Sequence, residues 1–332
     1  MKTLQIVQPG TICLTQTPEP VPGPGEIKVK IHYAGFCGSD LNTFRGANAM
    51  VTFPRIPGHE IGASIEALGS DVPDTFKPGQ IVTLNPYTSC GKCASCRRGR
   101  PNACENNETL GVQRDGAMKE FICVPWQKVI PCGEVPMKYT ALIEPMSVGF
   151  HAANRGRVTK DDVVMVIGCG MVGLGALVSA VQRGATVIAA DIDEVKLQLA
   201  KKLGAAYAYN SATEWTGDLP EPDVVIEAVG SVLTYRMAVE RVAFTGRIVC
   251  IGYAKTDVSL PTSLFVKKEL DIMGSRNATP EDFSDVISYL SSGVDADAFI
   301  SDIIDPKDAQ DAMERWNANP GKVFRILTKW SI

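Results

Sequence analysis

The sequence predicts an α/β protein in which a β-rich region with long loops precedes a doubly wound parallel sheet. Its 332 residues exceed what one hydrophobic core usually holds, so about two domains are expected. Up to about residue 150, prolines and glycines repeatedly interrupt short apolar segments. From about residue 160, apolar runs of strand length alternate with segments of helical spacing, which is typical of a parallel sheet covered on both faces.

The β-rich region starts with a stretch from Thr17 to Gly25 that is rich in proline and glycine and predicts a turn. After it, Ile27, Val29 and Ile31 alternate with polar residues, and this period of two predicts a strand with one buried face. Helical periodicity is scarce in this region, so short strands joined by loops are expected.

The second region supplies the elements of the parallel sheet. The expected strands are Val163–Ile167, Thr186–Ala190, Val224–Ile226, Arg247–Ile251 and Leu270–Met273. A helix is expected from Glu194 to Leu203, with Val195, Leu197, Leu199 and Leu203 on its buried side. In the tail, the expected elements are helices near Pro280–Leu290 and Pro306–Trp316 and a strand at Val323–Leu327.

Composition excludes several classes of protein. The chain is 45% hydrophobic, and its net charge of −4 offers no basic face for nucleic acid or acidic lipid. The uncharged stretch 163–182 contains several glycines after a β-forming run, so a strand, a turn and a helix are expected rather than a membrane span. The start has no apolar signal core, so we expect a cytoplasmic protein. Its ten cysteines then indicate metal binding or catalysis rather than disulfides.

A glycine fingerprint, Gly168-x-Gly170-x-x-Gly173, follows an expected strand and opens an apolar helix. In this context the glycines permit a tight turn, close approach of the backbone to a pyrophosphate, and packing of the helix on the strand. Asp191 closes the next strand, where a carboxylate accepts hydrogen bonds from the adenosine ribose and repels a 2′-phosphate. NAD is therefore expected rather than NADP. The alternative is a glycine run that serves helix packing alone.

Four cysteines follow one another closely in the β-rich region. Cys90, Cys93, Cys96 and Cys104 have the spacing C-x2-C-x2-C-x7-C. Four thiolates on one loop suit a closed tetrahedral zinc site that has a structural role. An iron–sulfur cluster also uses four cysteines, but zinc is preferred because no second cysteine group accompanies the loop.

Three further segments carry metal-binding residue types. They are Cys37-Gly38-Ser39-Asp40, Gly58-His59-Glu60, and Ile143–Gly149 with Glu144. Each segment alone is ambiguous, because a single histidine or buried cysteine is more often structural. Together they offer a thiolate, an imidazole and two glutamate carboxylates.

With these motifs in this order, the chain resembles the zinc-containing medium-chain alcohol dehydrogenases over essentially its whole length. The resemblance is to the branch of sorbitol, threonine and other polyol or sugar-acid dehydrogenases. It implies a GroES-like catalytic domain with the structural zinc loop (1–148), a Rossmann NAD-binding domain (149–274), and a C-terminal segment (275–332) that returns to the catalytic domain. It also implies two zinc ions per chain, one catalytic and one structural.

The resemblance assigns roles to individual residues. It implies that Cys37 and His59 bind the catalytic zinc, together with Glu60 or Glu144 and water. It also implies that Asp40 orients His59, that Ser39 relays the proton, and that Arg276 lies near substrate and nicotinamide. Many relatives have a histidine where this chain has Asn42, so the proton must leave by another route. The residues expected to bind the nucleotide are Gly168, Gly170, Met171, Val172, Gly173, Asp191, Lys196, Val229, Ile251 and Ser275.

The implied reaction is hydride transfer from a secondary alcohol of a polyol, sugar or sugar acid to NAD. The alternatives are an L-threonine-like amino-alcohol substrate, a zinc-free reductase, or a non-catalytic nucleotide-binding relative of the same fold. Arg45, Arg114 and Arg276 are either contacts for a carboxylate or phosphate, or surface charges. The expected assembly is a homotetramer or a homodimer.

Overall fold

The structure, a computed structural model, describes residues 1–213 and 218–330. The chain forms two compact units: the first comprises Met1–Glu144 and Phe283–Ile332, and the second comprises Pro145–Asp282. Helix α4 (Ile143–Arg155) crosses the first junction, so no loop marks it. This helix was not predicted from the sequence. The domain limits expected at 148/149 and 274/275 stay a prediction.

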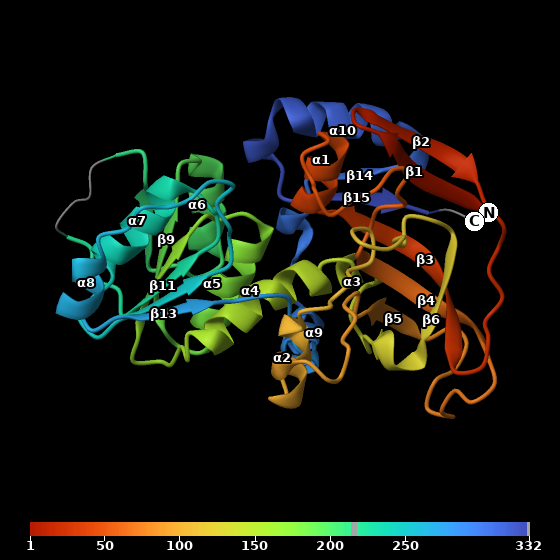
Figure 1. Cartoon of the computed structure of the whole chain (residues 1–332), viewed down its shortest axis with the longest axis horizontal. Coiled ribbons are helices and arrows are strands. Elements are labelled where there is room, and N and C mark those ends of the chain that lie inside the picture. The colour runs from red at the N-terminus through yellow and green to blue at the C-terminus, as the bar shows by residue number, and fades with distance from the viewer. Residues whose placement is uncertain (214–217, 331–332) are drawn as a thin grey trace. The chain divides into compact units, whose positions relative to one another are not determined.

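The first unit is built on a seven-stranded sheet with the order β14-β15-β3-β4-β5-β7, and β6 also pairs with β3 (Figure 1). Its strands are β3 (Glu26–Phe36), β4 (Glu60–Leu68), β5 (Ile81–Leu84), β6 (Phe121–Pro125), β7 (Val129–Pro131), β14 (Asp302–Ile304) and β15 (Ile326–Lys329). A separate hairpin consists of β1 (Lys2–Gln8) and β2 (Thr11–Gln16). The predicted alternation in β3 is confirmed, because Ile27, Val29 and Ile31 are fully buried.

The tail of the chain completes this sheet. Strand β15 pairs antiparallel with β3, with Ile326 opposite Phe36. The strand expected from Val323 therefore begins three residues later. The reason is local: the Phe324 N–H donates to Oγ of Ser301 rather than to a neighbouring strand.

The other elements of the first unit are α1 (Gly38–Phe44), α2 (Ala94–Arg97), α3 (Met137–Thr140), α10 (Ala309–Ala318), η1 (Pro101–Ala103), η2 (Trp126–Lys128), η3 (Asp297–Phe299), η4 (Pro306–Asp308) and η5 (Pro320–Lys322). Helix α9 (Pro280–Ser291) crosses the second junction.

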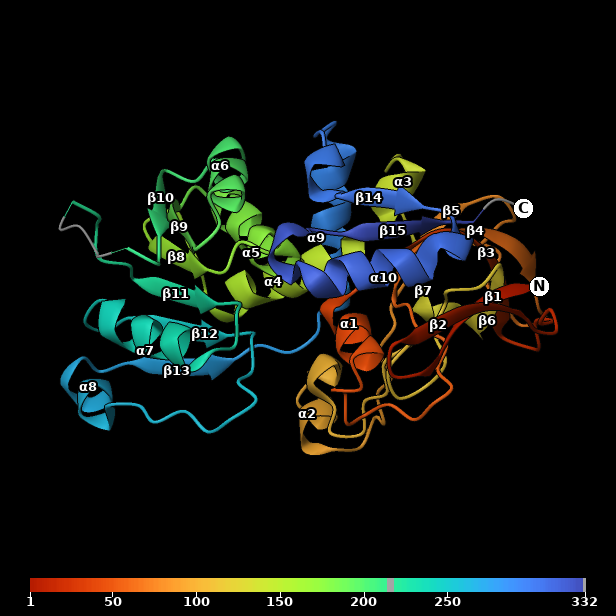
Figure 2. The same cartoon turned by 90° about the horizontal axis from the view of Figure 1, so that it is seen from above.

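The second unit contains the predicted parallel sheet, with the strand order β10-β9-β8-β11-β12-β13 (green to blue in Figures 1 and 2). Its strands are β8 (Val163–Ile167), β9 (Thr186–Asp191), β10 (Tyr207–Asn210), β11 (Val224–Glu227), β12 (Arg247–Cys250) and β13 (Asp271–Gly274). Strand β10 was not predicted from the sequence; it is the edge strand of this sheet, and its residues Tyr207 and Ala208 are exposed.

At the centre of this sheet, both faces are buried. Met165 and Ile167 pack with the helix residues Ala238 and Val239, while their neighbours Val164 and Val166 are equally buried and point to the opposite face. The helices of this unit are α5 (Met171–Gln182), α6 (Glu194–Lys202), α7 (Val232–Arg241) and α8 (Thr262–Lys267). In the described part of the chain, no helix has the length and apolar character that a membrane crossing needs.

One side-chain prediction in α6 is wrong. Val195 was expected on the buried side, but 65% of it is exposed. The buried face of α6 passes through Leu197 and Ala200, which are three residues apart and therefore share a face. Val195 lies in the first turn, beyond the edge of that face.

Candidate functional site

Two neighbouring strands of the first unit bring together three candidate metal ligands. Cys37 directly follows β3, while His59 precedes β4 and Glu60 is its first residue. Because β3 and β4 are antiparallel and Gly35 lies opposite Glu60, the end of one strand meets the start of the other. The donor atoms of Cys37, His59 and Glu60 consequently lie within 4.8 Å of one another.

His59 is positioned by the turn that precedes it. Gly58 has φ +100°, and a Cβ there would lie 2.7 Å from the side chain of Met118, so glycine is required. The Ala117 N–H donates to the Gly58 carbonyl over 2.9 Å, and the Met118 N–H donates to the Pro57 carbonyl over 3.0 Å. These bonds fix the backbone immediately before the imidazole.

Glu60 is completely buried and lies against a positive charge. Its Oε2 is 3.0 Å from Nε of Arg325, the residue that precedes β15. The same guanidinium donates to the Phe36 carbonyl over 2.7 Å. A Cβ on Gly35 would lie 2.3 Å from the Glu60 carboxylate, so only glycine leaves room for it. Burial raises the pKa of Glu60 well above its ordinary value, and Arg325 opposes that rise.

Cys37 and His59 stabilise each other as a charged pair. Burial alone would raise the pKa of Cys37, but the positive charge and the hydrogen bond of His59 lower it to about 7. Burial would also lower the pKa of His59, but the Cys37 thiolate raises it well above its ordinary value. The site therefore favours an ionised sulfur, the form that binds metal.

Asp40 and Ser39 lie at the start of α1, beside this cluster. Asp40 Oδ2 accepts a hydrogen bond from the Cys37 N–H over 2.8 Å, which ties the carboxylate to the start of its own helix. The implied hydrogen bond to His59 is not formed: Asp40 Oδ1 and His59 Nδ1 each lack a hydrogen-bond partner among the described residues. Asp40 still contributes a negative charge that raises the pKa of His59. The buried hydroxyl of Ser39 also has no partner within the described ranges.

Glu144 belongs to a different element from the three clustered residues. It lies in the first turn of α4, is almost fully buried, and accepts a hydrogen bond from the phenol of Tyr87. It is not one of the three residues whose donor atoms lie within 4.8 Å of one another, although its charge also raises the pKa of His59. Burial and the Glu144 charge raise the pKa of Tyr87, which keeps the phenol protonated as a donor.

The chemistry of this donor set fits a zinc ion. Zinc accepts one thiolate, one imidazole and one carboxylate, and a catalytic site keeps a fourth position open. Both His59 Nδ1 and Glu60 Oε1 are buried without a hydrogen-bond partner in the part of the chain that the structure describes. Buried polar atoms without partners are costly, and an ion bound beside them offsets that cost.

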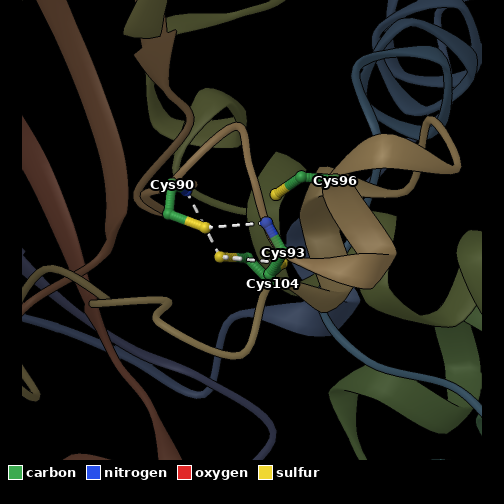
Figure 3. Close-up of side chains that lie close together, drawn as sticks. All are labelled: Cys90, Cys93, Cys96 and Cys104. Carbon is green, nitrogen blue, oxygen red and sulfur yellow. Dashed lines mark hydrogen bonds between the residues drawn. The ribbon is translucent and has the colours of Figure 1, made fainter.

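The four cysteines of the loop converge as their spacing predicts. Figure 3 shows Cys90, Cys93, Cys96 and Cys104 with their sulfurs turned toward a common centre. Their sulfurs lie within 4.8 Å of one another, and those of Cys93 and Cys104 are 3.8 Å apart. Hydrogen bonds, chiefly with Ser95, lower the pKa of Cys93 to about 5. All ten cysteines are free thiols, so this cluster suits a closed structural zinc site.

The glycine fingerprint lies between β8 and α5 in the second unit. Gly168 has φ +94°, and a Cβ on Gly173 would lie only 1.7 Å from the Gly168 carbonyl oxygen, so both positions require glycine. Gly170 precedes α5, and a Cβ there would meet nothing within 4 Å. Open space beside the N-terminus of a helix fits a pyrophosphate. Met171 and Val172 supply the first N–H groups of α5.

Asp191 ends β9 and lies next to this glycine turn. Its carboxylate accepts hydrogen bonds from the N–H groups of Cys169, at 2.7 Å, and Asp193, at 3.0 Å. Each carboxylate oxygen retains a further lone pair for a ribose hydroxyl. Asp193 caps α6 by accepting from the N–H of Lys196, which places Lys196 in the first turn of that helix.

The other residues expected to bind the nucleotide follow the ends of the later strands. Val229 follows β11 and is half exposed, Ile251 follows β12, and Ser275 follows β13. The buried Glu227 shapes this edge: its Oε1 accepts from the N–H groups of Val229 and Gly230 at 2.9 and 2.8 Å. The carboxyl ends of parallel strands are where such sheets bind ligands.

The three arginines considered for substrate contact have different surroundings. Arg45 donates to Asn317 Oδ1 over 2.6 Å, which ties α1 to α10. Arg114 is half-buried and donates to the Pro86 carbonyl, and burial lowers its pKa. Arg276 is exposed after β13. Its role beside substrate stays a prediction.

Three residues that support these sites were not predicted from the sequence: Arg325, Tyr87 and Glu227. Glu227 could have been noticed as a lone acid closing a buried apolar strand. Arg325 and Tyr87 gave no local signal, because their partners Glu60 and Glu144 are distant in the sequence.

Comparison with known proteins places the chain in a family. Residues 23–136 match the alcohol dehydrogenase GroES-like domain, and residues 172–292 match the zinc-binding dehydrogenase domain. The L-galactonate-5-dehydrogenase of Escherichia coli (strain K12) is 34% identical over 300 residues, with 88% of each chain covered. A sorbitol dehydrogenase of Halalkalibacterium halodurans is 31% identical, also with 88% of each chain covered.

A solved structure agrees over the whole chain. The alcohol dehydrogenase rspB from E. coli CFT073, in complex with the cofactor NADH, superposes with a TM-score of 0.92 at 30% identity. The superposition covers 99% of each chain. The predicted combination of a GroES-like domain with a Rossmann-type parallel sheet is thereby confirmed. The chain belongs to the zinc-containing medium-chain alcohol dehydrogenase family, and it is an oxidoreductase that uses zinc and a nicotinamide nucleotide.

Proposed function

We propose that this enzyme oxidises a secondary alcohol of a polyol, sugar or sugar acid, such as an aldonate, and transfers the hydride to NAD. The observation that carries the proposal is the cluster of Cys37, His59 and Glu60, whose donor atoms lie within 4.8 Å of one another. It holds one thiolate and one carboxylate, and a second carboxylate, Glu144, is buried in the same unit. This anionic, oxygen-rich site suits a substrate with several hydroxyl groups.

Different residues of the chain bind the metal and transfer the proton. Cys37, His59 and Glu60 hold the metal, with Glu144 as the other candidate ligand. When bound, zinc lowers the pKa of the substrate hydroxyl and NAD accepts the hydride. The buried Ser39 hydroxyl, which has no partner among the described residues, would relay the proton: it accepts the proton of the substrate hydroxyl while it passes its own proton on. Asn42 cannot titrate, so the proton passes on through water, a cofactor hydroxyl or one of the glutamates.

NAD is favoured over NADP by Asp191. Its carboxylate lies at the end of β9, next to the glycine turn that receives the pyrophosphate. A negative charge there accepts hydrogen bonds from the ribose hydroxyls and repels a 2′-phosphate. We propose that Gly168, Gly170, Met171, Val172, Gly173 and Lys196 surround the phosphates and adenosine ribose, and that Val229, Ile251 and Ser275 line the remainder of the nucleotide.

The substrate class rests partly on relatives. One similar protein is named for L-galactonate and another for sorbitol, and an L-threonine 3-dehydrogenase of Mesorhizobium japonicum is 28% identical over 336 residues. Polyols, sugars and sugar acids are therefore the first candidates, and hydroxy amino acids are the second. A non-catalytic role is disfavoured, because the residues expected to hold the metal lie together.

The test is a substrate panel assayed with NAD and with NADP. It contains polyols, aldonates, amino alcohols and simple primary alcohols, each followed by reduced nucleotide absorbance. The proposal predicts the highest kcat/KM for a polyol or aldonate with NAD, and no activity in Cys37→Ser. Activity confined to simple primary alcohols, or a clear preference for NADP, would contradict it. Cys13→Ser, outside both cysteine sites, is the matched control.

A further inference from the structure

Glu227, the last residue of β11, accepts hydrogen bonds from two different loops. Oε1 of its carboxylate accepts from the N–H groups of Val229, at 2.9 Å, and Gly230, at 2.8 Å. Its backbone carbonyl accepts from the N–H groups of Ile251, at 2.8 Å, and Gly252, at 3.2 Å. A single residue therefore holds both the loop that follows β11 and the loop that follows β12.

The carboxylate of Glu227 is buried where an apolar side chain would be usual. The three preceding residues of β11 are apolar and fully buried, as is typical of a central strand in a parallel sheet. Glu227 has no exposed surface either, and burying a carboxylate costs free energy unless it is hydrogen-bonded. The bonds from Val229 and Gly230 offset this cost, so the acid at this position serves the loop that follows the strand.

The two loops pack closely against each other and against the glycine fingerprint. A Cβ on Gly252 would lie 2.2 Å from the Gly230 nitrogen, and a Cβ on Gly230 would lie 2.6 Å from the Tyr253 nitrogen. A Cβ on Gly168, the first glycine of the fingerprint, would lie 2.5 Å from Cγ2 of Val229. A shift of the loop that follows β11 would therefore change its contacts with both of its neighbours.

The strand order places these loops beside one half of a bound dinucleotide. Asp191 ends β9, the fingerprint follows β8, and β11 and β12 come next on the side of β8 opposite to β9. Dinucleotides bind across the carboxyl ends of such strands. With the adenosine ribose at Asp191 and the pyrophosphate at the fingerprint, the nicotinamide half lies over β11 and β12. The Val229 side chain, which is 51% exposed, is available for contact there.

Resting on the nucleotide site proposed above, we propose that Glu227 is a positioning residue for the nicotinamide half of the cofactor. It holds the loops after β11 and β12 in the arrangement that lines this half. Because Glu227 has no exposed surface, it acts through Val229 and Ile251 rather than by a contact of its own. Moving its carboxylate away from the two N–H groups should therefore weaken binding of the whole dinucleotide and leave binding of the ADP-ribose part unchanged.

Two substitutions separate the position of the acceptor from its chemical type. Glu227→Asp keeps a carboxylate but withdraws it by one methylene from the N–H groups, whereas Glu227→Gln keeps an oxygen acceptor on a side chain of the same length. The dissociation constants of NADH and ADP-ribose are measured by isothermal titration calorimetry on the full-length enzyme. We expect Glu227→Asp to bind NADH about ten-fold more weakly, as for the loss of one good hydrogen bond, with ADP-ribose unchanged. Glu227→Gln should bind both molecules nearly as wild type does.

Asp223→Glu is the matched control, because Asp223 lies just before β11, at the opposite end of the same strand, and accepts from the Val163 N–H over 2.8 Å. Moving that carboxylate by one methylene should change neither dissociation constant. Unchanged NADH affinity in Glu227→Asp, an equal loss of ADP-ribose affinity, or an equal loss of NADH affinity in Glu227→Gln or Asp223→Glu would overturn the inference.

Failure of the proposed cofactor preference gives a different result. A wild type that binds NADPH more tightly than NADH would overturn the preference for NAD alone, because both nucleotides carry the same nicotinamide half. The comparison is then made with NADPH. A selective loss of NADPH affinity in Glu227→Asp supports the role of Glu227, and unchanged NADPH affinity overturns it.

Discussion

Arg325 lies 3.0 Å from Glu60, measured from Nε to Oε2, and both side chains are almost completely buried. The ion pair joins the residue before the last strand to the first residue of β4. It neutralises a carboxylate that the fold places among the metal donors. Arg325 also donates to the Phe36 carbonyl, one residue before Cys37. A single guanidinium therefore supports two of the three clustered ligands.

Replacing Arg325 with methionine is expected to destabilise the protein strongly. The change leaves Glu60 buried without its counter-charge, and such losses cost about 3–5 kcal/mol. The free energy of unfolding, measured by urea denaturation, checks this expectation. Arg315→Met is the control, because Arg315 and Asp302 form an exposed pair worth about 1 kcal/mol or less. Equal losses of unfolding free energy in the two variants would show that the buried Arg325–Glu60 pair contributes no more to stability than an exposed pair.

Replacing Cys93 with serine is expected to remove the structural ion and leave the catalytic one. Cys93 is buried within the four-cysteine cluster, whose geometry is closed and offers no position for substrate. Zinc content should fall from two ions to about one per chain, with lower thermal stability or impaired assembly. Elemental analysis and thermal unfolding measure both effects. Loss of both ions, or of neither, would contradict the assignment of two independent sites.

Replacing Asp191 with alanine is expected to weaken the preference for NAD. Hydrogen bonds to a charged group contribute about 1.5–3 kcal/mol, so kcat/KM with NAD should fall roughly ten- to hundred-fold. Activity with NADP should fall less, because repulsion of the 2′-phosphate is lost. Asp193→Asn is the control, since Asp193 caps α6. A NADP/NAD ratio that stays at the wild-type value would rule out the proposed role of Asp191.

Asp282 is expected to make stability depend on acid pH. It accepts hydrogen bonds from His151 at 2.8 Å and from the Thr279 N–H at 2.7 Å. Burial would raise the pKa of Asp282, but the bonds from His151, Thr279 and Asn154 lower it. Its contribution is therefore present above the unfolded-state pKa of about 4 and is lost as pH falls toward the folded-state value.

The measurement for Asp282 compares wild type with Asp282→Asn in urea denaturation from pH 7 to pH 3. The difference in unfolding free energy should be largest at pH 7 and shrink below about pH 4. A difference that is constant across this range would mean that the Asp282 charge does not contribute.

Local patterns in the sequence predicted the parts of the fold that depend on neighbours along the chain. Strand β8 has the predicted limits, because it is a run of five apolar residues, the last four of them buried, within a parallel sheet. The glycine turn and the four-cysteine loop were likewise predicted from spacing alone, and in each the residues involved lie within a short segment.

Other features could not be predicted because they depend on distant residues. Tyr87 contacts Glu144 because Glu144 lies in the first turn of α4, a helix that was not predicted from the sequence. Asp40 accepts a hydrogen bond from the Cys37 N–H at the start of its own helix rather than from His59. The spacing of these residues in the sequence does not determine which of the two is its partner. Val195 was misplaced because apolar character alone does not show which face a first-turn residue takes.

The central claim is that Cys37, His59 and Glu60 hold a catalytic zinc that is separate from the cysteine-loop zinc. The most direct test measures zinc per chain and dehydrogenase activity in wild type and Cys37→Ser side by side. The claim predicts two zinc ions in wild type, about one in Cys37→Ser, and loss of NAD-linked activity with the second ion. Wild-type zinc content in Cys37→Ser, or full activity without the second ion, would contradict it.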